Sequence, residues 1–397
     1  MKLNIFNLIK KNKDTFLIFI FSVVLFYLII NLSFSDIKDH LKHVVNINND
    51  SSTYPPNFLY YFLANLFSGF TNNFQLLTFS AIFILALSVT FKYEVTKYII
   101  RDFSNQKSIV ITNNQIILFA LSLLFFFSIP DHYSLLHLKH LYSSRFPPQV
   151  WHNSTTIFVF PFALLLFWKQ YKFMTFNFIN KKKQLLIISL LIIINVFIKP
   201  SFLFVFIPIT GLFILNNFWK KGIKTMFIYA LPSIIGGGLI LLSYILIYHL
   251  QTGSMHSQNS GIYISAPFEI FFLWIPKWYL PISLLMSFIF PIIFFMLYTN
   301  FIKDKLVKYG LSILFLSILI SAFIMEEGPR RTHGNFIWQN YIAVYIIELI
   351  TTLFFISIYF LKNQNKIKLK VLKIIFALHI LSGIAYIMKI IYTGDYS

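Results

Sequence analysis

The residues best suited to chemistry follow the first long apolar run, in the segment "SDIKDHLKH". Asp36, Asp39, His40 and His43 fall at i, i+3, i+4 and i+7, so a helix in this segment would align them on one face. A carboxylate beside a histidine can act as a general base, and carboxylates can also ligate a hard cation. A hydrated loop with ordinary surface charges is the competing interpretation.

A second group, "VWHN", precedes an apolar run that begins near residue 154. The indole of Trp151 and the imidazole of His152 could stack on a sugar and hydrogen-bond to it, with Asn153 beside them. A tryptophan at such a boundary is equally typical of a membrane-interface anchor. Asp131 and several histidines occur nearby, but their spacing does not match a histidine zinc motif on a helix: His132, His137 and His140.

Lys199 lies between two apolar runs in "NVFIKPSFLF". Its ammonium, a point charge with three donors, suits a phosphate or pyrophosphate group. The alternative is that this lysine extends its charged end to the membrane surface and has no further role. Pro200 either begins the next helix or kinks one long helix.

The segment "IMEEGPRRTHGNFIWQN", residues 324–340, concentrates charge in a chain that is only 12% charged. Arg330, Arg331 and His333 offer two planar forks and a third donor, a combination that suits a phosphate. Ion pairs between these arginines and the glutamates at 326 and 327 are the simpler interpretation. Charged side chains in the poorly hydrated region of a membrane surface are energetically costly, and such residues usually have a function.

The elements that must position these residues are apolar helices. The chain is 57% hydrophobic, and runs of about 20 apolar residues recur along it, as bilayer-spanning helices require. The sequence therefore predicts an all-α polytopic transmembrane bundle that forms one integral membrane domain over residues 1–397. Eleven spans fit the pattern: 16–33, 74–91, 114–130, 154–168, 184–198, 200–216, 226–248, 279–298, 309–325, 336–361 and 371–392.

The basic residues predict the orientation of the bundle. With the N-terminus in the cytoplasm, the inner segments, including 92–113, hold 24 of the 33 Lys and Arg residues, as the positive-inside rule expects. The orientation of the spans then accounts for most of the net charge of +20. Nucleic acid is therefore not an expected partner. The outer loop 34–73 contains the apolar segment 57–70, which is predicted to be an interfacial helix with Tyr60 and Tyr61 at the membrane surface.

Two further properties limit the chemistry. The sequence has no cysteine, which excludes disulfides, thiolate metal sites and a cysteine nucleophile. The first apolar run has no small-residue cleavage site nearby, so we expect an uncleaved first span and not a signal peptide.

This arrangement resembles the GT-C superfamily of polytopic membrane glycosyltransferases, which includes protein O-mannosyltransferases and lipid A aminoarabinose transferases. Those enzymes have a cytoplasmic N-terminus, an acidic residue soon after the first span, and interfacial helices in the first outer loop. "SDIKDH" is similar to the acidic site, and "YPPNFLYYFLANL" is similar to the proline-containing entry to an interfacial helix. The resemblance covers the topology of the first half of the chain and extends loosely to the second half.

The resemblance implies inverting transfer of a sugar from a polyprenyl phosphate or pyrophosphate to a hydroxyl of a glycan, lipid or protein at the extracytoplasmic face, in cell-envelope glycan assembly. Asp36 or Asp39 would be the general base, Lys199 and the two arginines would bind the departing phosphate, and Trp151 and His152 would contact the sugar. No cofactor is firmly expected. A divalent metal is an open alternative, although Asp36 and Asp39 are not an adjacent acidic pair and so argue against a metal-dependent mechanism. The remaining candidate substrate contacts are His40, Tyr54, Asn153, His333 and Asn335.

Other function classes remain open at this point. A polysaccharide polymerase or ligase would also act on lipid-linked substrates, but such enzymes rely on a large late outer loop, and 249–278 and 326–335 are modest. A lipid-linked sugar flippase or other transporter would need charged or broken helices near the midplane, where "IIGGG" at 234–238 is the strongest break. The chain carries no large C-terminal soluble domain like that of oligosaccharyltransferases, so protein N-glycosylation is not expected.

Overall fold

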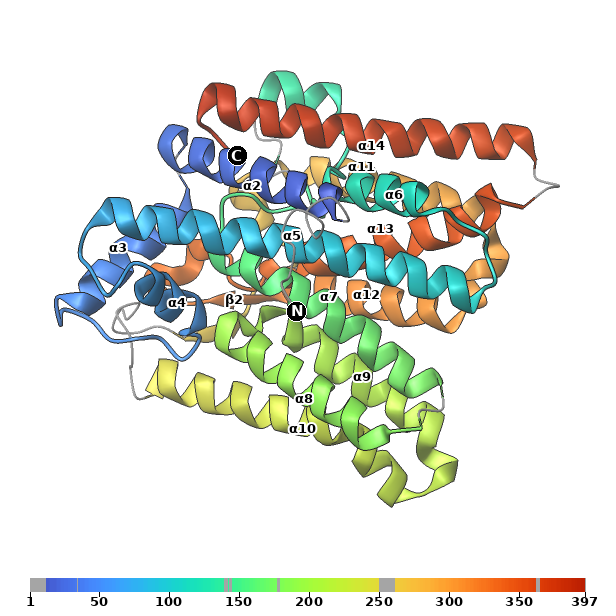
Figure 1. Ribbon diagram of the computed structural model, residues 1–397, viewed down its shortest axis with the longest axis horizontal. Coiled ribbons are helices and arrows are strands. Elements are labelled where there is room, and N and C mark those ends of the chain that lie inside the picture. Colours follow the sequence, from blue (N-terminus) through green and yellow to red (C-terminus); the bar gives the residue numbers. More distant parts are fainter. Residues whose placement is uncertain are drawn as a thin grey trace, which may run out of the picture.

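The computed structural model is a helical bundle with one small two-stranded sheet (Figure 1). It describes residues 12–33, 35–138, 142, 145–176, 179–249, 261–361 and 365–396, without the side chains at 329, 330 and 333. The longer elements are α2 (Lys13–Leu32), α3 (Asp36–Asn48), α4 (Leu59–Phe67), α5 (Phe74–Gln106), α6 (Asn113–Leu124), α7 (Ser154–Thr175), α8 (Lys181–Ile198), α9 (Leu203–Phe218), α10 (Ile223–Tyr244), β1 (Ile262–Ile264), α11 (Leu280–Leu297), α12 (Lys305–Phe323), β2 (Ile324–Glu326), α13 (Trp338–Tyr359) and α14 (Lys366–Thr393).

Within these described ranges, nine helices are long and apolar enough to cross a membrane, which makes the chain a multi-pass membrane protein. They correspond to nine of the eleven predicted spans. The other two predicted spans, 114–130 and 184–198, fall on α6, which has 12 residues, and on α8, which begins with three lysines. Both apolar stretches are shorter than the roughly 20 residues of a typical span, so the count of eleven stays a prediction.

The bundle is built around α5 and α13. Helix α5 packs along α2 and α7, and nearly all of α13 is buried against neighbours that include α12, α11 and α5. Helix α10, along the lower edge in Figure 1, packs on α8 and α9 and leaves most of its apolar side chains exposed. Such a surface is expected where a helix faces lipid.

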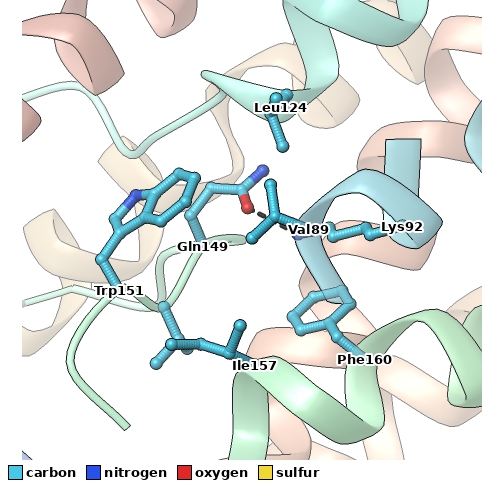
Figure 2. Close-up of a pocket in the computed structure, with 8 residues that line it drawn as sticks. Val89, Lys92, Leu124, Gln149, Trp151, Ile157 and Phe160 are labelled. Atoms are coloured by element: carbon cyan, nitrogen blue, oxygen red, sulfur yellow. Dashed lines mark hydrogen bonds between the residues drawn. The ribbon is translucent and has the colours of Figure 1, made fainter. Parts of the chain in front are cut away.

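Helix α5 extends further than predicted. Residues 92–106, which the sequence analysis assigns to an inner segment, continue the helix to Gln106. Lys92 is buried inside it, and its Nζ donates a hydrogen bond of 2.5 Å to Oε1 of Gln149 (Figure 2). The ammonium lies 3.6 Å from the ring centroid of Phe160 and 4.1 Å from that of Tyr345, so aromatic faces replace part of its lost hydration.

Helix α4 is shorter and less exposed than the predicted interfacial helix 57–70. It packs against α3 and α5, and the side chains of Tyr60 and Tyr61 are buried. Their rings contact the His40 ring at centroid distances of 6.0 and 5.5 Å. Both side chains are therefore covered by protein, and the position of α4 at the membrane interface stays a prediction.

A buried ion pair fixes the segment between α6 and α7. Arg145 pairs with Asp131, and its guanidinium also donates to the hydroxyl of Tyr279 at 2.5 Å and to that of Ser134 at 3.0 Å. Asp131, one of the residues considered for a metal, is thus engaged with an arginine. The cluster ties this segment to the residues that precede α11.

We expect Arg145→Met to lower the free energy of unfolding by about 3–5 kcal/mol, because it leaves the Asp131 carboxylate partly buried without its charged partner. Thermal unfolding in detergent measures the effect. The double variant Arg145→Met with Asp131→Asn should recover part of the loss. An Arg145→Met protein as stable as the wild type would show that the pair contributes nothing.

Candidate functional site

Asp36 is the first residue of α3. Ser35 before it is extended, and the helix begins at once, so the Asp36 carboxylate lies at the positive end of the helix dipole. His40 and His43 turn toward the protein from the same face, and the Asp39 side chain lies at its edge. Asp39 is 74% exposed and pairs with Lys42, also largely exposed, at 2.9 Å. The predicted shared face therefore holds for three of the four residues, and Asp39 points to the surface.

Asn153 connects Asp36 to the rest of the site. Its Nδ2 donates a hydrogen bond of 2.7 Å to Oδ2 of Asp36. Its Oδ1 caps helix α7 by accepting from the backbone N–H of Thr156 at 3.0 Å and also accepts from the Thr156 hydroxyl at 2.7 Å. The cap fixes the orientation of the amide, because Oδ1 must face the helix and Nδ2 must then face Asp36.

Lys199 approaches the same amide from the opposite side. Its Nζ donates to Oδ1 of Asn153 at 3.0 Å and to the Thr156 hydroxyl at 2.8 Å. Lys199 is the extended residue that ends α8, because the proline that follows disfavours a helical conformation at position 199. The break between two helices that "KP" predicts therefore places the Lys199 ammonium in the site.

Trp338 brings the segment 324–340 to the site by a route that the sequence did not indicate. The Lys199 ammonium lies 4.0 Å from the centroid of the Trp338 ring, a cation–π contact. Trp338 is the first residue of α13, and its ring is 6.0 Å from that of His152. No spacing or motif singles out this tryptophan, since its role depends on how α13 packs against the residues that follow α8.

The two histidines of the site are neutral at pH 7. Burial lowers the pKa of His40 to about 4, and the same cause lowers the pKa of His152 to about 4, although Asp36 raises both. His40 Nδ1 shares a short hydrogen bond with the hydroxyl of Ser154. Imidazoles held neutral can orient a hydroxyl or accept its hydrogen bond, and they leave Lys199 as the cation beside Asp36.

Figure 2 shows a small cavity lined by Lys92, Gln149 and Trp151 among others. Gln149 also donates to the backbone oxygen of Leu123 at 2.6 Å. Trp151 is buried and faces this cavity and the Phe26 ring, 6.3 Å away, so it is neither an exposed stacking platform nor an interface anchor. The hydrogen bond between Lys92 and Gln149 holds the irregular segment that leads to Asn153.

The charged segment pairs with a residue that the sequence analysis did not consider. Arg331 pairs with Glu269, while Glu326 accepts hydrogen bonds from Tyr248 at 2.7 Å and from Asn335. The expected partnership of Arg331 with Glu326 is therefore not formed. The predicted phosphate contacts of Arg330 and His333 lie outside the described side chains.

Tyr54 belongs to a different polar cluster. Its hydroxyl accepts from Nδ2 of Asn65 at 2.8 Å, and Asn65 in turn exchanges hydrogen bonds with Asn48. These contacts join the end of α3 to α4. The structure gives Tyr54 a role in holding α3, and its predicted contact with substrate stays untested.

The chain matches no family model, no curated protein and no solved structure.

A half-buried carboxylate and an ammonium are held on the two ends of one amide, with two neutral histidines and a tryptophan around them. In the described part of the chain, no three His, Asp or Glu side chains gather in a way that could hold a metal ion, and a metal requirement stays an open alternative. Such a pair can accept a proton at one end and stabilise a negative charge at the other.

Proposed function

We propose that this chain is a membrane glycosyltransferase that moves a sugar from a polyprenyl phosphate or pyrophosphate to a hydroxyl acceptor at the extracytoplasmic face. The observation that carries the proposal is the link between Asp36 and Lys199 through Asn153. These residues were predicted separately as the base and the phosphate ligand, and they are 163 positions apart in the chain.

In the proposed reaction the carboxylate of Asp36 accepts the proton of the acceptor hydroxyl. The hydroxyl oxygen forms a bond to the anomeric carbon, and the bond between that carbon and the phosphate oxygen breaks from the opposite side, which inverts the anomeric configuration. The electron pair leaves on the phosphate. Lys199 stabilises the growing charge, a contribution worth about 10²–10³ in rate where such groups act in a poorly hydrated site.

Asp36 is a better candidate for the base than Asp39. Its carboxylate is half-buried and oriented by Asn153, whereas Asp39 is exposed and paired with Lys42. A general base must be held within hydrogen-bond reach of the proton that it removes, and an exposed side chain on a surface helix turn lacks that restraint.

The proposal assigns the departing phosphate to Lys199 and not to Arg331. Arg331 would have to exchange Glu269 for the substrate, and this pair is more than half exposed on the arginine side. The Lys199 ammonium already lies beside the amide that holds Asp36. The indole of Trp338 under the ammonium supports its charge without neutralising it.

The proposal is tested with membrane vesicles from cells that produce the chain, incubated with a panel of radiolabelled polyprenyl-linked sugars. We expect label to pass from the organic phase into a glycan, glycolipid or protein fraction only in vesicles that contain the chain. Absence of transfer from every donor would contradict the assignment as a glycosyltransferase. Uptake of sugar into the vesicles with no covalent product would favour a transporter.

A further inference from the structure

The chain after α14 turns back onto the site. Gly394 ends the helix with φ of +70°, and a Cβ built on it would lie 2.5 Å from the carbonyl oxygen of Leu32, so the turn is seated against the end of α2. Asp395 pairs with Lys389 at 3.7 Å and its N–H donates to the Thr393 hydroxyl at 3.2 Å. Since Asp36 follows α2 by four residues, this turn is fixed next to the start of α3.

Tyr396 then covers His152. The two rings are stacked, with centroids 4.0 Å apart and planes at 11°, and the Tyr142 ring meets the same imidazole edge-on at 4.6 Å. The backbone oxygen of Tyr396 accepts a hydrogen bond of 2.7 Å from the Tyr386 hydroxyl. His152 is 2% exposed beneath it, and its Nδ1 has no hydrogen-bond partner among the described residues.

The Tyr396 ring is partly exposed, and its backbone oxygen is held by the Tyr386 hydroxyl. His152 beneath the ring is joined by the backbone to Asn153, the residue that holds Asp36. A sugar at the Asp36 carboxylate would lie next to the imidazole face that Tyr396 occupies. A flat aromatic face of this kind suits the C–H face of a pyranose as well as it suits a phenol ring.

We propose that the face of His152 is a binding subsite for a sugar ring, and that Tyr396 occupies it when the site is empty and has to leave before a sugar binds. This inference rests on the proposed glycosyl transfer for the identity of the ligand. The covering itself does not depend on that function.

Chemical footprinting with diethylpyrocarbonate, which acylates neutral imidazole, tests the cover on the full chain in nanodiscs. Because burial lowers the pKa of His152 to about 4, its imidazole is neutral at pH 7 and reacts whenever the reagent reaches it. Peptide mass spectrometry separates His152 from the buried His43, which reports whether a variant stays folded. The variants are Tyr396→Ala, Tyr396→Phe, which keeps the stack, and Tyr386→Phe, which removes only the bond to the Tyr396 carbonyl.

We expect Tyr396→Ala to raise the rate of His152 modification about tenfold and Tyr386→Phe about fivefold, with Tyr396→Phe at the wild-type rate. His152 as unreactive in Tyr396→Ala and Tyr386→Phe as in the wild type would overturn the inference. If His43 becomes reactive in Tyr396→Ala, that variant has lost its fold, and the rate of His152 modification in Tyr386→Phe then tests the inference.

A kinetic measurement tests the subsite. In the transfer assay Tyr396→Ala should lower the KM for one sugar substrate about fivefold with little change in kcat, because the competitor for the subsite is gone. A lower kcat with unchanged KM would assign Tyr396 a structural role and overturn the subsite. If His152 becomes reactive as expected but no variant and no wild-type protein transfers sugar, it is the proposed function that fails.

Discussion

Replacing Asp36 by asparagine is expected to lower sugar transfer by about 10²–10⁴-fold, the usual contribution of a positioned general base. The amide of the variant keeps an oxygen that can accept from Nδ2 of Asn153, so the loop and the start of α3 should stay in place. The loss should therefore appear in kcat, with the KM for the donor nearly unchanged. Initial rates with a labelled polyprenyl-linked sugar measure both constants.

Asp39→Asn is the matched control. It makes the same chemical change three residues along the same helix, but on a side chain that is 74% exposed and paired with Lys42 in solvent. Exposed pairs of this kind contribute about 0–1 kcal/mol, so transfer should stay close to the wild-type rate. If Asp39→Asn lost transfer and Asp36→Asn kept it, the assignment of the base would be reversed.

Transfer should fall as the pH rises through about 7. Burial lowers the pKa of Lys199 from its ordinary 10.5 to about 7, although the carboxylate of Asp36 opposes the shift. The ammonium that stabilises the phosphate is the protonated form, so it is present below this pH and is lost above it. Because kcat/KM reports the ionisation of the free enzyme, rates at low donor concentration from pH 5.5 to 9 measure the effect.

Two variants separate Lys199 from other causes of an alkaline decline. Lys199→Arg keeps its charge throughout this range, so the decline above pH 7 should disappear, even where the peak rate is lower because a guanidinium has a different shape. Lys199→Met should lose about 10²–10³ in kcat/KM below pH 7, and its deficit relative to the wild type should shrink as the pH rises above 7. A profile of Lys199→Arg with the same alkaline limb as the wild type would exclude Lys199 as the titrating group.

The helices could be read from the sequence because hydropathy is a local property. Nine of the predicted spans fall on long apolar helices, and the break at Lys199 follows from the proline beside it. The burial of Lys92 could not be predicted, because it depends on residues far away in sequence. Only the packing of Phe160 and Tyr345 around its ammonium shows why a lysine can be buried in the bundle.

The site could be predicted as separate residues but not as a network. Asp36, Asn153 and Lys199 are candidates by type and position, yet their connection depends on contacts over 117 and 46 positions of sequence. Asp39 seemed equivalent to Asp36 because helical spacing alone places both on one face. Packing of α3 against α7 and α4 decides which carboxylate turns inward, and that choice has no local signal.

Partners of the charged residues between α12 and α13 were the least predictable. Arg331 has two glutamates within five positions, but it pairs with Glu269, 62 positions away. Glu326, five positions before Arg331, is buried and accepts hydrogen bonds from Tyr248 and Asn335. Ion pairs at surfaces follow small differences in geometry and hydration, so proximity in sequence is a weak guide to them.

The fate of the label on a polyprenyl-linked sugar tests the central claim most directly. Purified wild-type chain in proteoliposomes, given this donor and a hydroxyl acceptor, should attach the sugar covalently to the acceptor and release one polyprenyl phosphate or pyrophosphate for each sugar transferred. The Asp36→Asn protein should do neither at a comparable rate. Donor that stays intact and only crosses to the other leaflet, at equal rates with both proteins, would contradict the account.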